Sequence, residues 1–355
     1  HITCSEEGVT FNQYNYEKDL VQRHEAVKGT AKTPLMKESP PESESDITVE
    51  LVRRAQAYAG ELLWLAQRSR PELCYAVSRM SQLITKCPRF AIRSAEVMIQ
   101  YVRGTLGQSM HYPAQPPQHG LHDELAPEVG PDLLEGFSDA SYAQDCGKSQ
   151  SGIVVCWARA PILWLSFRQG LTASSTAESE LTASMDSLQA LDAVSGMLEE
   201  LVGIPPRRYQ FIDNVSAVQC MRLPSGPWRT RALRIKAKVF LDQLQSNTIT
   251  IYNLACLYML ADLCTKHLDA TRLRFLLELL HIRPPLGSAG RGESAASAAA
   301  AVESEEPASL FAAGQEPEPA PPESLQAEAL TENVAENSPT PDSPANPPDL
   351  ESLKK

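Results

Sequence analysis

The sequence predicts an α/β protein in which a mixed five-stranded sheet flanked by helices occupies residues 133–283. A helical segment precedes this sheet, and a disordered tail follows it. Three observations lead to this fold class. Short strand-like runs alternate with long helical periods after residue 133. Apolar residues recur at helical spacing between 49 and 105. Proline, alanine, glutamate and serine dominate the chain after residue 284.

The first 132 residues contain two structured segments and two linkers. Residues 8–11 are typical of a strand. Between 49 and 105, apolar spacings of three and four predict helices that Pro71 and Pro88 interrupt. Prolines and polar residues predict a linker at 34–48, and five prolines predict another at 113–132. The predicted segments are 1–33, 34–48, 49–112 and 113–132.

The segment 133–283 carries the strands and helices of the predicted sheet. In chain order, the pattern predicts strands at 134–137, 152–158 and 162–167, a long helix at 176–202 and a strand at 209–212. Helices at 215–221 and 231–244, a strand at 248–252 and a helix at 257–268 follow. The long helix ends at Gly203, which two prolines soon follow. This order predicts a mixed sheet with helical layers.

Charge and cysteine content restrict the class of protein. The 355 residues carry a net charge of −12. The tail at 284–355 has 13 acidic and 3 basic residues, so 3 − 13 = −10 of that charge lies there, and we expect this tail to be disordered. Eight scattered cysteines predict reduced thiols of an intracellular protein, in the cytoplasm or nucleus, and not a secreted disulfide framework. No apolar stretch has the length of a membrane span, so we expect no membrane partner.

Acidic residues lie at the ends of predicted strands and within predicted helices. Asp139 and Asp213 end strands, Glu178 and Glu180 lie in the first turns of the long helix, and Asp262 lies in the last helix. Carboxylates gathered at one sheet edge repel one another unless a cation holds them, and Mg²⁺ prefers oxygen ligands. Two such ions activate water in phosphodiester cleavage. Each acid alone is better explained by ordinary strand-end or helix-dipole preferences; the combination indicates a metal site.

Six segments in order resemble the ribonuclease H domain of Copia-type LTR retrotransposon Pol polyproteins. They are GFSDASYA at 136–143, KSQSG at 148–152, WLSFRQ at 164–169, STAESEL at 175–181, DNVSA at 213–217 and ADLCTKHL at 261–268. Upstream, AGELLWLA at 59–66, RPEL at 70–73 and YVRGT at 101–105 resemble the reverse-transcriptase thumb or connection segment, and GVTFNQ at 8–13 resembles the segment that directly follows the polymerase palm. The Y-x-D-D motif of the polymerase is absent.

The resemblance implies a ribonuclease H-like fold and metal-dependent cleavage of the RNA strand of RNA–DNA hybrids. It implies two Mg²⁺ ions, which Mn²⁺ can replace, with Asp139, Glu180, Asp213 and Asp262 as catalytic and metal-binding residues. Glu180 is chosen over Glu178 because ELTA at 180–183 resembles the family's E-L-x-A. Two residues apart on a helix, the two side chains point about 200° apart, so only one reaches the metals. The implied partners are the hybrid and the remaining Pol polyprotein, including polymerase palm and integrase.

Departures from the family pattern leave other functions open. Ser141 replaces an acidic residue, 256–260 is apolar where the family is polar, and 229–235 keeps its cations but lacks a histidine and an aspartate. These changes are compatible with a catalytically impaired retroelement remnant that binds nucleic acid or another partner. A related exonuclease or resolvase would share the metals but not these motifs. Basic residues at 229–238 either follow a phosphate backbone or form a solvated helix face.

Overall fold

The computed structural model describes residues 1–115, 130, 132–143, 147–222 and 231–284, without the side chains of 231 and 232. The chain divides into two units, and every described residue lies in the first, His1–Glu306. The second unit, Pro307–Lys355, lies outside the described residues, as do the predicted tail after Pro284 and most of the predicted linker at 113–132. Within the described part of the chain, no helix has both the length and the apolar character needed to cross a membrane.

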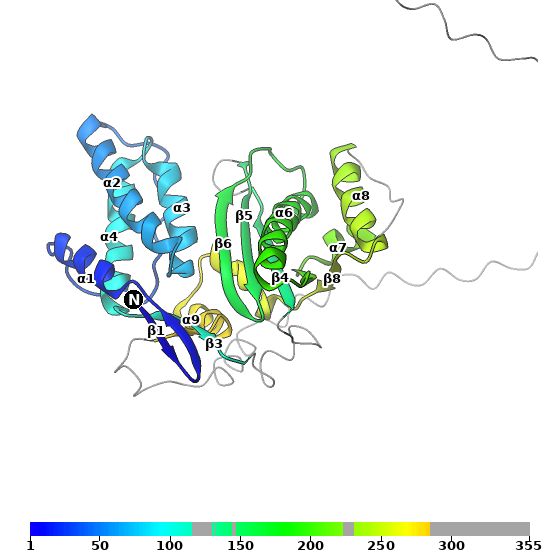
Figure 1. Ribbon diagram of the computed structural model, residues 1–355. Coiled ribbons are helices and arrows are strands. Elements are labelled where there is room, and N and C mark those ends of the chain that lie inside the picture. The colour runs from blue at the N-terminus through cyan, green and yellow to red at the C-terminus, as the bar shows by residue number, and fades with distance from the viewer. Residues whose placement is uncertain (116–129, 131, 144–146, 223–230, 285–355) are drawn as a thin grey trace, which may run out of the picture. The chain divides into compact units, whose positions relative to one another are not determined.

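A mixed five-stranded sheet forms the centre of residues 133–283 (Figure 1). Strand β4 (Leu133–Ser141) lies in its middle. On one side, β5 (Gln150–Trp157) and β6 (Ala160–Arg168) extend the sheet with antiparallel pairing. On the other, β7 (Arg207–Ile212) and β8 (Thr250–Asn253) extend it with parallel pairing. The order β6-β5-β4-β7-β8, with helices on both faces, confirms the predicted mixed five-stranded sheet flanked by helices.

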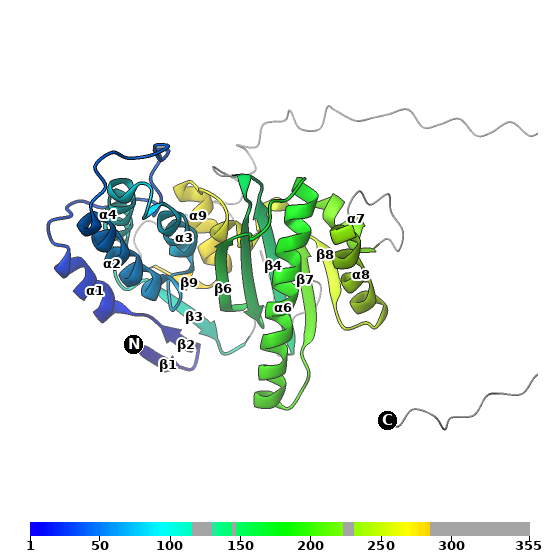
Figure 2. The same ribbon diagram turned by 90° about the horizontal axis from the view of Figure 1, so that it is seen from above.

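Helices α6 (Thr176–Val202), α7 (Val215–Arg222) and α8 (Arg231–Gln245) lie on one side of this sheet (Figure 2). Strand alternation points Leu134 and Ile153 into the core that they share with α6, α7 and α8. All three helices form where the sequence predicts them.

The boundaries of α6 follow from its flanking residues. The Ser175 side chain accepts a hydrogen bond from the Glu178 backbone N–H at the first turn. At the other end, Gly203 has a φ of 77°, a left-handed conformation that glycine adopts without a steric penalty. The predicted range 176–202 is therefore confirmed.

On the opposite face, the sheet shares one apolar core with residues 259–264 and with the N-terminal helices α2 (Val49–Ala66), α3 (Cys74–Leu83) and α4 (Pro88–Gly104). The sheet side chains in this shared core are Leu133, Phe137, Val154, Cys156, Trp164, Tyr209 and Phe211. The Trp164 indole N–H also donates a hydrogen bond to the Ala66 carbonyl, at 2.7 Å. The segments predicted separately as 49–112 and 133–283 thus share one apolar core.

A second, four-stranded sheet joins the start and the end of the described chain. Its order is β1 (Ile2–Ser5), β2 (Gly8–Phe11), β3 (Ser109–Pro113) and β9 (Ile282–Arg283), with antiparallel pairing throughout. The sequence predicts only β2 among these strands. Since β9 belongs to the predicted segment 133–283 but pairs with β3, the division into domains stays a prediction.

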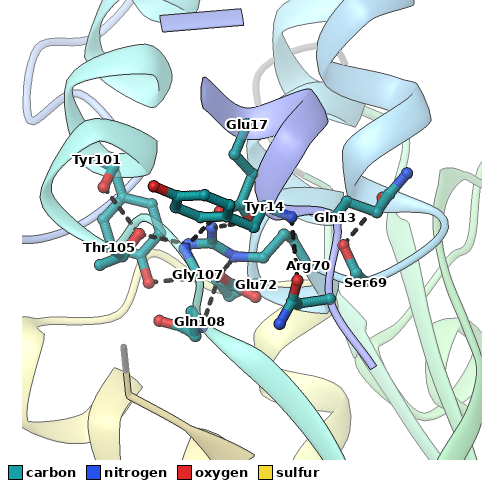
Figure 3. A network of polar contacts seen from close by, with 11 residues as sticks. Gln13, Tyr14, Glu17, Ser69, Arg70, Glu72, Tyr101, Thr105, Gly107 and Gln108 are labelled. Carbon is teal, nitrogen blue, oxygen red and sulfur yellow. Dashed lines mark hydrogen bonds and ion pairs between the residues drawn. The ribbon is translucent and has the colours of Figure 1, made fainter. Parts of the chain in front are cut away.

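A buried ion-pair network fixes the turns around this second sheet (Figure 3). The fully buried Arg70 guanidinium lies 2.9 Å from a Glu17 oxygen on α1 (Tyr14–Arg23) and 2.6 Å from a Glu72 oxygen on the short helix η1 (Pro71–Leu73). The second Glu17 oxygen accepts the Gly107 N–H at 2.7 Å. A buried charge without such partners is strongly destabilising, so the network constrains how these segments meet.

The prediction of a single helix over 257–268 is wrong. The structure has two short 3₁₀ turns, η2 (Cys256–Tyr258) and η3 (Leu260–Cys264). Met259 separates them because its backbone is extended, with φ −71° and ψ 99°. The next helix, α9, covers Ala270–Leu279 and was not predicted.

Candidate metal centre

The two strand-end aspartates are brought together by the register of parallel strands. Phe137 on β4 and Phe211 on β7 are direct partners, and their rings stack with centroids 4.8 Å apart. Asp139 and Asp213 each lie two residues further along. Because side chains alternate with a period of two, both carboxylates lie on the phenylalanine face at the same edge of the sheet.

Asp262 reaches this edge because η3 passes very close to β5. Gly152 of β5 pairs with Asp139. A Cβ at Gly152 would lie 2.6 Å from Thr265 Cγ2 and 2.8 Å from the Ala261 carbonyl oxygen, so only glycine permits this approach. As a result, carboxylate oxygens of Asp139, Asp213 and Asp262 all lie within 4.8 Å of one another.

Cationic and hydroxyl groups already contact two of these carboxylates. Lys266 Nζ lies 2.7 Å from Asp262 Oδ1 and 3.3 Å from Asp139 Oδ1. Arg272 Nη2 lies 3.1 Å from Asp262 Oδ2. The Thr265 hydroxyl donates a hydrogen bond to Asp139 Oδ2. Every carboxylate oxygen of Asp139 and Asp262 therefore has a protein partner.

Glu180 lies close enough to Asp139 and Asp213 to interact with their charges, although it is not part of the group within 4.8 Å. Its side chain comes from the first turns of α6 and is 6% exposed. Among the described residues, its Oε2 atom has no hydrogen-bond partner. Burial, followed by the negative charges of Asp139 and Asp213, raises the pKa of Glu180 to about 9.

The aspartates experience the same crowding of negative charge. Burial and then the charge of Asp139 raise the pKa of Asp262 to about 6. The same two causes, in the same order, raise the pKa of Asp213. A cation bound among these carboxylates would lower their pKa values, because it favours the ionised form of every carboxylate.

Glu178 has a different environment from Glu180. Its Oε2 accepts hydrogen bonds from the Ser174 N–H at 2.8 Å and the Ser174 hydroxyl at 2.6 Å. These bonds lower the pKa of Glu178. The Glu178 carboxylate is therefore bound to the turn that precedes α6. Of the two glutamates, only Glu180 lies near the aspartates. The catalytic role of each residue stays a prediction.

Comparison with known proteins gives related sequences along most of the chain. No family model matches. Over 271 residues, the chain is 27% identical to the Retrovirus-related Pol polyprotein from transposon RE1 of Arabidopsis thaliana, covering 74% of this chain and 17% of that protein. Over 237 residues, it is 25% identical to the Truncated transposon Ty1-A Gag-Pol polyprotein of Saccharomyces cerevisiae, covering 66% of this chain and 19% of that protein. The chain is a relative of the Copia-type Pol polyproteins. It spans less than a fifth of the length of either relative.

Two solved structures also align with parts of this chain. One is the ribonuclease H1 LC11, isolated from compost by a metagenomic approach, with a TM-score of 0.25 and 12% identity over 35% of this chain and 86% of that one. The other is a foamy viral protease–reverse transcriptase in complex with double-stranded DNA, with a TM-score of 0.37 and 12% identity over 71% of this chain and 36% of that one.

Several groups that surround these carboxylates were not predicted from the sequence. Thr265 and Lys266 belong to the motif at 261–268, so the signal for them was present but unassigned. Arg272 lies outside all six motifs. Cys256 donates a hydrogen bond to Asp213, and burial together with the Asp213 charge raises the pKa of this thiol to about 11.

The last residue of the motif at 164–169 also has a structural role that the sequence did not reveal. The buried Gln169 amide donates hydrogen bonds to the Ser179 carbonyl, at 2.9 Å, and to the Ser151 hydroxyl, at 3.0 Å. This contact holds the backbone directly before Glu180 against β5.

Proposed function

We propose that this chain carries a metal-dependent endonuclease that cleaves the RNA strand of RNA–DNA hybrids. The observation that supports it best is the group of three aspartate oxygens within 4.8 Å, with an unpartnered Glu180 oxygen beside it among the described residues. Carboxylate oxygens are the ligands that Mg²⁺ prefers, and burial together with the neighbouring carboxylate charges raises the pKa of Glu180 and of Asp262. The donor set therefore fits a divalent cation.

In this proposal, Asp139, Glu180, Asp213 and Asp262 hold two Mg²⁺ ions, which Mn²⁺ can replace. When bound, such a pair of ions would supply activation of a water and charge stabilisation at the leaving oxygen of a phosphodiester. The protein's own contribution is to fix the ligands. Thr265 holds Asp139, Arg272 holds Asp262, and Gln169 holds the first turn of α6.

The wider setting of the activity is also a proposal. Because the chain spans less than a fifth of its Pol relatives, we propose that it works beside the remaining parts of a Pol polyprotein, including a polymerase palm and an integrase. The predicted intracellular location and the predicted lack of a membrane partner stay predictions.

The test is cleavage of a labelled RNA–DNA hybrid by the purified chain, with duplex DNA and duplex RNA as parallel substrates. We expect Mg²⁺-dependent cleavage of the RNA strand of the hybrid alone, and its loss in EDTA. Asp139→Asn should abolish cleavage while the protein stays folded, because this change removes one ligand at nearly constant volume.

Glu180→Gln and Glu178→Gln form a matched pair, since both change the first turns of α6. We expect Glu180→Gln to abolish cleavage and Glu178→Gln to leave most of it. An inactive Glu178→Gln variant would reverse this assignment. If the wild type binds the hybrid in Mg²⁺ but cleaves nothing, the impaired-remnant function replaces the nuclease.

A further inference from the structure

Lys266 occupies an unusual position among the basic residues of the metal centre. Its ammonium contacts two of the three clustered aspartates, Asp139 and Asp262, at 3.3 and 2.7 Å. Thr265 and Arg272 each contact only one of them. Lys266 thus bridges two side chains that the proposed function assigns to the metal ions.

The position of the ammonium matches what a cation does in this group. Asp139 and Asp262 come from different elements, β4 and η3, and their charges repel one another. An opposite charge within about 4 Å of both offsets that repulsion, and its effect is large in a partly buried setting. Lys266 therefore links η3 to the edge of the sheet electrostatically.

The Lys266 side chain can also move away from the aspartates into solvent. It is 39% exposed, whereas those of Asp139 and Asp262 are 2% and 6% exposed. A flexible four-carbon stem lets its ammonium move into solvent, where it is strongly hydrated. The aspartates stay in place, because Thr265 and Arg272 still contact them.

We propose that Lys266 is an exchangeable internal counter-ion of the metal centre. Its ammonium holds Asp139 and Asp262 together in the metal-free protein, and a divalent cation displaces it on binding. This inference rests on the proposed metal-dependent function. Lys266 is thus a positioning residue that maintains the metal-free site and lowers its affinity for the metal.

The test measures thermal stability and Mg²⁺ affinity of the full chain, without reference to cleavage. In EDTA, Lys266→Met should lower the melting midpoint by about 2–4 °C, because the aspartates lose their cation. Saturating Mg²⁺ should remove most of this difference, since the metal neutralises the same carboxylates. In calorimetry, the variant should bind Mg²⁺ roughly tenfold more tightly, because no ammonium competes.

Two further variants separate this role from ordinary ion pairing. Lys266→Arg keeps the charge and should keep the metal-free stability of the wild type. Lys238 forms an ion pair of the same i,i+4 spacing with Asp242 on α8, at 3.1 Å, with both side chains exposed. Lys238→Met is therefore the matched control, and it should leave Mg²⁺ affinity unchanged.

The outcomes distinguish this proposal from the proposed function. If the wild type binds Mg²⁺ and Lys266→Met binds it equally or more weakly, the counter-ion role is wrong while the metal function stands. An equal loss of stability with and without Mg²⁺ would also overturn it, because it would show a purely structural ion pair. If the wild type binds neither Mg²⁺ nor Mn²⁺, the proposed function fails first, and this inference falls with it.

Discussion

Glu135 shows how a single buried acid makes the stability of this fold depend on pH. It lies on β4, four residues before Asp139, and is fully buried beside Arg159, whose Nε is 3.5 Å from Glu135 Oε1. Burial raises the pKa of Glu135 from 4.5 to about 7, although the Arg159 charge acts in the opposite direction. The folded state therefore holds a proton that the unfolded state releases between these pH values.

The sign of the resulting effect follows from proton linkage. The contribution of Glu135 to stability is fully present below pH 4.5 and is lost as the pH rises through about 7. In urea unfolding between pH 5 and 8, we expect Glu135→Gln to have a flatter dependence on pH than the wild type. The difference in slope is at most about 1.4 kcal/mol per pH unit. Identical slopes for the two proteins would contradict the raised pKa.

At the scale of elements, the approach of η3 to β5 depends on one missing side chain. Gly152→Ala would place a methyl group 2.6 Å from Thr265 Cγ2 and 2.8 Å from the Ala261 carbonyl oxygen. We expect a loss of about 1–3 kcal/mol in unfolding free energy, as is typical of overpacking. Mg²⁺ affinity should fall as well, because η3 carries Asp262 away from the sheet.

Gly196 offers the matched control for this substitution. It lies on α6, and among the described residues no atom beyond its chain neighbours and its own helix backbone lies within 4 Å of where an added methyl group would stand. Gly196→Ala therefore adds volume without a clash. Replacing a helical glycine by alanine should raise stability by about 0.5–1 kcal/mol. Denaturant unfolding of both variants checks the pair, and similar losses in the two would contradict the role of the close approach.

Elements with local sequence signals are predicted correctly, whereas those that depend on distant contacts are not. Ser175 and Gly203 mark both ends of α6, and its predicted range is confirmed. The apolar run at 256–260 resembles a helix, but Met259 is extended and fully buried, and β9 is a two-residue strand whose partner β3 lies about 170 residues earlier. The four acids of the candidate site came from motifs, whereas the contacts of Lys266 and Arg272 with them required the fold.

For the whole molecule, the N-terminal helices complete the core of the five-stranded sheet. Phe137, Trp164 and Phe211 face the same apolar core as α2, α3 and α4. A fragment of residues 132–284 should therefore melt at a lower temperature than residues 1–284 and should bind a hydrophobic dye, because this face of the sheet loses the part of its cover that the N-terminal helices supply. Thermal melts and dye fluorescence test this, and equal midpoints without dye binding would support the predicted division into domains.

The pairing of β9 with β3 has a consequence for biosynthesis. Strand β3 is synthesised long before β9, and α9, which shares the apolar core of the N-terminal helices, also comes late. The four-stranded sheet and this core therefore cannot be complete on the ribosome until residue 283 has emerged. Contacts of such large sequence separation form slowly, and strand edges that are still unpaired are prone to aggregation. A ribosome that stalls between β3 and β9 would leave a nascent chain with an unpaired β3 edge and an open core, the kind of surface that chaperones recognise.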